Sequence, residues 1–276
     1  MTRRLPPAHL FLARRLRELA TRLSATIPRV RGRTDDEAIH DMRVALRRRR
    51  VVLRIARPVF GRYHCDSIRL ALARVQRATG ALRDEEVLRE TLKALETGEA
   101  ELDAWIARRA RREEGLRAII DHRLRAGDLR RPLRMLRALL ALPVRPDRRR
   151  PVAAFAHKAV SRARKNVDRR RDASPDDAAA LHALRIAYKR LRYTTEIFSE
   201  ALPPDVAALA EPAAHFQKRL GEIHDLDVAR DAMTKARALS PSAKARVLEA
   251  IERRRVERVQ KYVAEAGHEH SRSADR

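Results

Sequence analysis

The chain has 276 residues, of which 63 are Lys or Arg and 37 are Asp or Glu, so its formal net charge is +26. Apolar residues make up 44% of the sequence, which is enough for a packed core and excludes a disordered basic tail. So positive a chain favours polyanionic partners: nucleic acid, anionic lipid headgroups and polymeric phosphate are all open at this point. The single cysteine, Cys65, excludes an internal disulfide and a cysteine-based metal site.

The composition predicts an all-α protein, because Ala, Leu, Arg and Glu dominate while glycine (8 residues) and β-branched runs are scarce. No run of 18 apolar residues occurs, so we expect a soluble, cytoplasmic protein. Helices of roughly 15–25 residues should fill the intervals between the sequence's breaks. In chain order the candidate breaks are Pro6 and Pro7, residues 28–32, Gly61, Gly80, Gly98, Gly127, residues 143–151, Ser174 and Pro175, Pro203 and Pro204, Gly221, and Ser240 and Pro241.

A row of basic side chains, headed by a histidine, marks the second expected helix. Its members stand 3, 4, 3 and 4 residues apart, which places them on one helical face. No Asp or Glu lies between Asp41 and Asp66, and an apolar stripe, interrupted by Arg49, runs one residue ahead of the row. One face of this helix should therefore be buried and the neighbouring face cationic. The row consists of His40, Arg43, Arg47, Arg50 and Arg54.

A second block follows at residues 76–87, with the pattern Q-[RK]-x-x-G-x-[LI]-x-D-x-[ED]-V, and it recurs at 217–228. Gly80 and Gly221 are predicted to separate helices here. Asp84 and Asp225 should then lie near the start of the next helix, where a carboxylate can cap it. Long helices are expected afterwards, near residues 99–126 and 242–266.

The basic row also recurs in the second half of the chain, with the same spacing, as His182, Arg185, Lys189 and Arg192. Recurrence of both blocks indicates an internal repeat. We therefore expect two tandem helical bundles related by a pseudo-two-fold axis. Residues 1–142 would form the first half, 143–267 the second, and 268–276 a disordered tail.

Both halves carry H-x-x-R-[VI]-A-x-[RK]-R-x-R followed by G-x-[LI]-x-D-x-[DE]-V, and these blocks resemble the CHAD domain (conserved histidine α-helical domain). The segments LHALRIAYKRLRY and LGEIHDLDVARD are similar to that family's second-half signature. The resemblance implies two four-helix bundles around a central basic surface, which bind inorganic polyphosphate and associate with polyphosphate granules. The implied binding residues are His40, Arg43, Arg47, Arg50, Arg54, Arg77, His182, Arg185, Lys189, Arg192 and Lys218.

Two other functions remain open at the level of sequence. Nonspecific nucleic-acid binding needs only positive charge, although one Asn, three Gln and 4% aromatic residues leave little for reading or stacking on bases. A metal-dependent phosphohydrolase could use His40 and Asp41, but the repeat replaces Asp41 with Ala183. We expect no catalytic residue, metal or other cofactor, and granule-associated proteins are further candidate partners.

Overall fold

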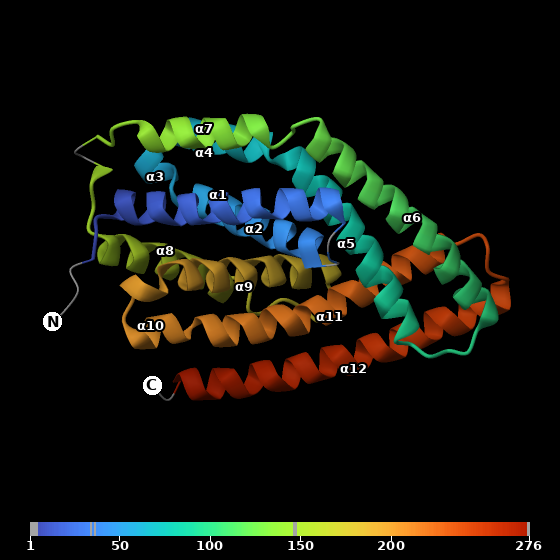
Figure 1. Cartoon of the computed structure of the whole chain (residues 1–276). Coiled ribbons are helices and arrows are strands. Elements are labelled where there is room, and N and C mark those ends of the chain that lie inside the picture. The colour runs from blue at the N-terminus through green and yellow to red at the C-terminus, as the bar shows by residue number, and fades with distance from the viewer. Residues whose placement is uncertain (1–4, 34, 36, 146–147, 275–276) are drawn as a thin grey trace. The chain divides into compact units, whose positions relative to one another are not determined.

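The computed structural model describes residues 5–33, 35, 37–145 and 148–274, with side chains up to residue 267. Every regular element in these ranges is helical, apart from one isolated antiparallel bridge between Pro7 and Pro151. The all-α prediction is confirmed. None of the helices in the described ranges has the length and apolar character that crossing a bilayer requires. The helices labelled in Figure 1 are α1 (Ala8–Gly32), α2 (Glu37–Ile55), α3 (Arg57–Phe60), α4 (Arg62–Ala71), α5 (Ala73–Lys93), α6 (Ala100–Arg125), α7 (Arg130–Ala141), α8 (Val152–Asp168), α9 (Ala178–Phe198), α10 (Pro204–Ala208), α11 (Ala210–Thr234) and α12 (Pro241–Ala274), and a 3₁₀ turn, η2 (Ser199–Ala201), follows α9.

Most of the expected breaks lie between helices, but three do not. Residues 28–32 form the last turn of α1, and Pro28 lies inside that helix. Gly80 lies inside α5 and Gly221 inside α11, so the prediction that they separate helices is wrong. A glycine weakens a helix interior by only about 1 kcal/mol relative to alanine, and the good helix formers around both positions outweigh that cost. Asp84 and Asp225 consequently stand in mid-helix, where they cannot cap a helix start.

The chain's C-terminal region also differs from expectation. The helix α12 continues to Ala274, so residues 268–274 are helical where the sequence predicted disorder. The sequence here, His-Glu-His-Ser-Arg-Ser-Ala, has no proline and follows a series of strong helix formers, which lets the helix propagate past Gly267. Residues 275–276 of the predicted tail lie outside the described residues.

The chain forms two compact units, and each draws on both halves of the sequence. The boundary expected between residues 142 and 143 therefore does not coincide with the boundary between the units. The helices α5, α6, α8 and α9 contribute residues to both, as does α11 through its first residue, Ala210. Unit 1 comprises residues 1–82, 115–165 and 190–210, and unit 2 comprises residues 83–114, 166–189 and 211–276.

The helix bounds themselves recur along the sequence. The offset that relates His40 to His182 carries the bounds of α2 to positions 179 and 197, each just inside the corresponding end of α9. The offset that relates Gly80 to Gly221 brings the end of α5 onto the end of α11, at Thr234, and the start of α6 onto the start of α12, at Pro241. This recurrence supports the internal repeat, whereas the pseudo-two-fold axis stays a prediction.

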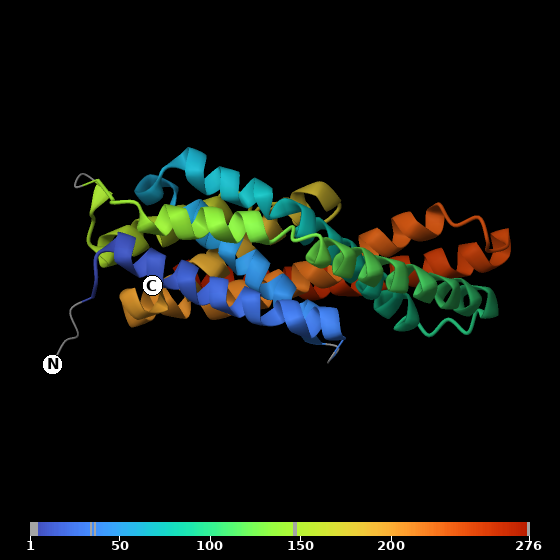
Figure 2. The same ribbon diagram turned by 45° about the horizontal axis from the view of Figure 1, so that its top comes forward.

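Unit 1 is built around α1 and α2, which lie side by side in Figures 1 and 2. The apolar stripe of α2 is buried as its spacing predicted, with Met42, Leu46 and Leu53 inaccessible to solvent. The ring of Phe11 on α1 stacks on Phe198 with centroids 5.5 Å apart. Because this stripe fixes how α2 is rotated, the basic row is held at the edge of the core rather than out in solvent.

Unit 2 has its own core, in which Trp105 packs with apolar residues of α5, α11 and α12. The helices α11 and α12 run antiparallel and are joined by ion pairs along their length. Arg219 donates to Glu265 at 2.8 Å, and Arg255 donates to Asp227 at 2.7 Å in a buried pair. Removing one partner of such a buried pair is strongly destabilising, so Asp227 has a structural role.

Candidate anion-binding site

The first basic row lies along α2 in unit 1, and we call it the first ridge: His40, Arg43, Arg47, Arg50 and Arg54. His40 is exposed, whereas the four arginines are half-buried. The fifth basic residue predicted for this half, Arg77, is exposed on α5. The helix therefore presents the row on one face, as its spacing predicted, and the arginines stand partly inside the protein rather than fully in water.

Partial burial leaves the guanidinium groups near the end of this ridge in a strongly positive environment. Burial, and after it the charge of Arg69, lowers the pKa of Arg50. Burial lowers the pKa of Arg54 to about 10, and neighbouring arginines add to the effect: Arg190, Arg69, Arg50 and Arg57. In the described part of the chain, Asp66 is the carboxylate that pairs with this group, binding Arg57 and Arg69. One carboxylate cannot balance five guanidinium groups, so the site is electrostatically suited to an anion.

Besides Arg57, which pairs with Asp66, sequence reasoning missed two arginines of this cluster, Arg69 and Arg190. Arg69 comes from α4, which no repeat block includes, and only packing against α2 brings it to the ridge. Arg190 is adjacent to Lys189 in the sequence, and it corresponds to Arg48 in the first half. The spacing along α9 places Arg190 outside the predicted row, so the spacing pattern that identified the row does not include it. Tertiary structure supplied the missing signal in both cases.

An aromatic side chain orients part of the first ridge. Arg47 lies over the ring of Tyr193 at 5.3 Å from its centroid, and Arg192 lies over the same ring at 5.5 Å. Arg192 also donates to Glu196 at 2.7 Å, so its charge is partly satisfied within the chain. The Nε of Arg47 is buried and has no acceptor among the described residues. Tyr193 and Glu196 are thus positioning residues that the sequence did not single out.

The second basic row lies along α9, and we call it the second ridge: His182, Arg185, Lys189 and Arg192. Its first three members belong to unit 2 and Arg192 to unit 1. Lys218, which the sequence grouped with this row, is exposed on α11. Burial lowers the pKa of Arg185, and the carboxylates of Asp225 and Asp84 oppose that effect. Its buried Nε has no hydrogen-bond acceptor among the described residues.

His182 is held by a second histidine, His224, from α11. Their Nδ1 atoms are 3.2 Å apart, so one ring nitrogen donates and the other accepts. Burial lowers the pKa of both rings, and the positive charge of Arg185 adds to it, bringing His224 to about 4. The pair is therefore neutral at pH 7. His224 was not predicted as a site residue, and its counterpart in the first half is Arg83.

The acidic residues of the second block have two roles: some form ion pairs within the fold, and others act on a ridge arginine. Asp227 pairs with Arg255, and Glu86 lies 3.6 Å from Arg83. Burial raises the pKa of Asp225, while the charge of Arg185, a ridge residue, opposes that rise. Asp225 and Asp84 therefore both act on the ridge residue Arg185 through their charge. Within the described ranges no group of three or more His, Cys, Asp or Glu side chains has the arrangement of a metal site.

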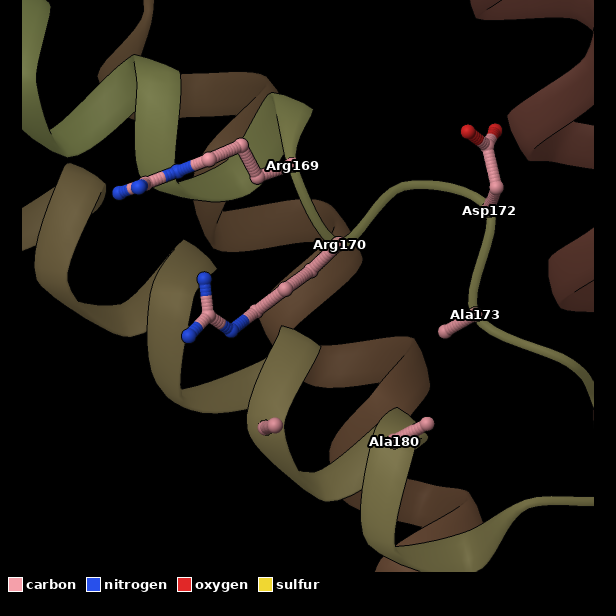
Figure 3. Close-up of a pocket in the computed structure, with 6 residues that line it drawn as sticks. Arg169, Arg170, Asp172, Ala173 and Ala180 are labelled. Carbon is pink, nitrogen blue, oxygen red and sulfur yellow. The ribbon is translucent and has the colours of Figure 1, made fainter.

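Two further basic features lie away from the ridges. The helix α7 packs beside α4 (Figures 1 and 2) and exposes Arg130, Arg131, Arg134 and Arg137. An open pocket of about 600 Å³ lies at the loop after α8. Figure 3 shows Arg169, Arg170 and Ala180 of α9 among the residues that line it. At 100° per residue, Ala180 and Ala183 face roughly the opposite side of α9 from the second ridge.

Comparison with known proteins agrees with this architecture. The model of the CHAD domain matches residues 14–234, a range that contains both ridges. None of the curated protein sequences compared with the chain matches it significantly. The crystal structure of the CHAD domain from the plant Ricinus communis is similar with a TM-score of 0.71 and 23% identity, covering 94% of this chain and 88% of that one. PptA from Streptomyces chartreusis is similar with a TM-score of 0.67 and 19% identity, covering 95% of this chain and 99% of that one. At these identities the solved structures show a shared fold, and the match of the family model over both ridges shows that the chain belongs to the CHAD domain family.

Proposed function

We propose that the protein binds inorganic polyphosphate through its two ridges, without catalysing a reaction on it. The observation that supports this most directly is the uncompensated arginine cluster of unit 1. Burial and neighbouring charges lower the pKa of Arg54 to about 10, so an anion placed among Arg50, Arg54 and Arg69 would relieve their repulsion. Guanidinium groups suit phosphate oxygens because their N–H donors form a planar fork.

Polyphosphate fits these surfaces better than nucleic acid does. Proteins that bind single strands stack the bases on accessible aromatic rings, but Tyr193, the aromatic residue at the first ridge, is only 3% exposed. A ridge of ten to fifteen residues spans roughly 15–20 Å of helix axis, and it offers charge at every turn. A phosphate chain without bases needs that density of charge and nothing more.

The proposed binding residues are those that the sequence indicated, joined by two arginines that the fold brings to the first ridge. Binding to long chains would also target the protein to polyphosphate granules, where other granule-associated proteins are candidate partners. The full set is His40, Arg43, Arg47, Arg50, Arg54, Arg69, Arg77, His182, Arg185, Lys189, Arg190, Arg192 and Lys218.

The experiment that tests this function is a binding titration with four polyanions at matched phosphate concentration. Long-chain polyphosphate, duplex DNA, single-stranded RNA and ATP would each be titrated at two salt concentrations. We expect long polyphosphate to bind most tightly near physiological salt and ATP to bind weakly. Equal or tighter binding of duplex DNA would favour a nonspecific nucleic-acid-binding protein instead.

A parallel assay separates binding from hydrolysis. Incubating the protein with polyphosphate and Mg²⁺ or Mn²⁺ should release no orthophosphate above the level of a protein-free control. Release that is lost on substituting His40 or His224 would instead show a metal-dependent phosphohydrolase. Imaging of a fluorescent fusion tests granule targeting, which should disappear in cells that contain no polyphosphate.

A further inference from the structure

Gly221 occupies a position where the folded chain gives no reason for glycine. It lies inside α11, where alanine would make a more stable helix. Its backbone does not adopt the positive φ that glycine permits at Gly61, Gly98 and Gly127. A Cβ atom built on Gly221 would meet no described atom within 4 Å apart from its chain neighbours and its own helix backbone. Neither backbone conformation nor crowding therefore accounts for it, and the missing side chain leaves open space against the helix backbone.

The contacts between α9 and α11 identify what faces that space. The rings of Tyr188 and Phe216 stack at 5.3 Å, and those of His182 and His224 lie 4.4 Å apart, so the helices run antiparallel. Arg185 is three residues beyond His182, and Gly221 is three residues before His224. In an antiparallel pair these offsets place Arg185 opposite Gly221. The two helices are neighbours in Figure 1.

The groups around Gly221 lack the partner that would fill this space. The buried Nε of Arg185 has no hydrogen-bond acceptor among the described residues. On α11, Lys218 and Gln217 stand one turn before Gly221, on the same helical face. The Oε1 atom of Gln217 is likewise buried without a partner in the described chain, and rotation of that amide would present an N–H donor instead. Donors thus lie beside this opening, and the carboxylates of Asp225 and Asp84, which act on Arg185 by their charge, accept no hydrogen bond from its Nε.

We propose that Gly221 keeps this space open so that a phosphate group of polyphosphate rests against the α11 backbone and accepts a hydrogen bond from Arg185. This inference rests on the proposed function and adds a specificity-determining position to it. Each internal phosphate of a nucleic acid is esterified to a sugar on both sides, whereas the internal phosphates of polyphosphate are joined only to further phosphates. The space that one absent side chain leaves is narrow. It therefore admits a phosphate chain without sugars more readily than a sugar–phosphate backbone.

The first half of the sequence repeats the glycine and the glutamine of this arrangement. Gly80 corresponds to Gly221 in the repeat, and it too lies in mid-helix, where a built Cβ would meet no described atom within 4 Å outside its own stretch of helix. Gln76 stands one turn before it, as Gln217 does before Gly221, and its Oε1 is also buried without a partner in the described chain. A packing accident would not be expected to occur at both equivalent positions.

The test is Gly221→Ala, with Gly115→Ala as its matched control. Gly115 also lies in mid-helix, in α6, with open space around a built Cβ, and it belongs to neither ridge. Both variants should remain helical and melt a few degrees higher, because alanine favours the helix. Gly221→Ala should weaken long-chain polyphosphate binding about tenfold or more, the loss of one charge-assisted hydrogen bond. The affinity of Gly221→Ala for duplex DNA should change less than about twofold. The affinities of Gly115→Ala for polyphosphate and for DNA should stay within the same limit, which is the usual size of the effect of a surface substitution.

The outcomes separate this inference from the proposed function. Wild-type protein that fails to prefer polyphosphate overturns the function itself. If the wild type prefers polyphosphate and Arg185→Gln weakens binding while Gly221→Ala does not, only the role of Gly221 is wrong. An equal loss for DNA and polyphosphate in Gly221→Ala would overturn the specificity claim. The double variant Gly80→Ala with Gly221→Ala should lose more affinity than either single variant, and no additional loss would restrict the device to the second ridge.

Discussion

Arg49 shows what one buried charge costs this fold. Its side chain is 1% exposed within the apolar stripe of α2, and its Nε and Nη2 have no acceptor among the described residues. Burial lowers its pKa to about 10, so it remains charged at pH 7. The equivalent position in the second half is Leu191, which is also buried. An unsatisfied guanidinium group in a core opposes folding, because it has lost its hydration without gaining a partner.

Replacing this arginine by the residue of its counterpart should therefore stabilise the protein. We expect Arg49→Leu to raise the free energy of unfolding by about 1–3 kcal/mol, the usual cost of a buried unsatisfied polar group. Urea unfolding followed by circular dichroism measures it, with polyphosphate affinity as a second readout that should stay constant. The converse variant Leu191→Arg should destabilise. A loss of stability in Arg49→Leu would mean that the guanidinium is stabilised in the fold.

The histidine pair makes stability depend on pH in a defined direction. The pKa of His224 falls from 6.5 to about 4 on folding, so between these values the unfolded chain binds more protons than the folded one. The free energy of unfolding should therefore decrease as pH falls from about 6.5 towards 4, and His224 should contribute nothing to the change above that window. Urea midpoints at pH 7.5 and 5 measure the decrease, which should be smaller in His224→Gln.

Polyphosphate affinity should depend on pH in the opposite sense. A bound polyanion favours the charged imidazole of His182, against the burial and the charges of Arg185 and Lys189 that lower its pKa. Binding should consequently take up protons and strengthen as pH falls from about 7.5 to 6. Calorimetry in buffers of different ionisation enthalpy measures the uptake. Binding that is independent of pH, with no proton uptake, would remove His182 from the phosphate site.

At the scale of the helix, each ridge should act as one cationic surface. Reversing two charges in the first ridge, by Arg43→Glu with Arg47→Glu, should weaken long-chain binding by more than about tenfold. Long chains lose the most because a chain that engages both ridges makes its second contact intramolecularly. The affinity for a short oligophosphate, which reaches only one ridge, should fall far less. Arg185→Glu with Lys189→Glu should behave alike.

The exposed arginines of α7 provide the control for this experiment. Arg130→Glu with Arg134→Glu changes the net charge by the same amount at the same spacing, on a helix outside both ridges. We expect it to reduce polyphosphate affinity by less than about threefold, a general electrostatic effect. Equal losses in the α7 and ridge variants would show that net charge alone drives binding. Complete loss in one ridge variant and none in the other would overturn the equivalence of the ridges.

The positions of the helices were largely predictable from sequence. Whether a helix continues through an internal glycine was not. Proline and glycine clusters correctly marked the ends at Gly61, Gly98 and Gly127, where positive φ values require glycine. Gly80 and Gly221 are glycines for a different reason, since they lie inside helices that continue through them. A sequence shows that glycine is present, but only the surroundings show whether it serves a turn or an opening. The same limit applied to Arg69, which reached the ridge through packing of α4.

On the scale of the whole molecule, the excess of positive charge should make stability and binding respond oppositely to salt. Raising NaCl from about 0.05 to 0.3 M screens repulsion among exposed and half-buried arginines, so the melting temperature of the protein alone should rise. The same change should weaken polyphosphate binding steeply, because counterion release contributes less at high salt. Thermal melts and titrations on one salt series check both. A melting temperature that falls with salt would show that the ion pairs dominate the repulsion.

The assembly of each unit from separate segments has a consequence for synthesis on the ribosome. Unit 1 needs residues up to 210, and unit 2 needs segments that begin at residue 83 and include α12. A nascent chain that has just emerged as far as residue 142 therefore holds neither core complete, even though it already displays the whole first ridge. For much of its translation the chain is therefore an incompletely folded polycation close to ribosomal RNA. Division of the protein at the sequence midpoint should likewise yield two fragments that refold only when both are present.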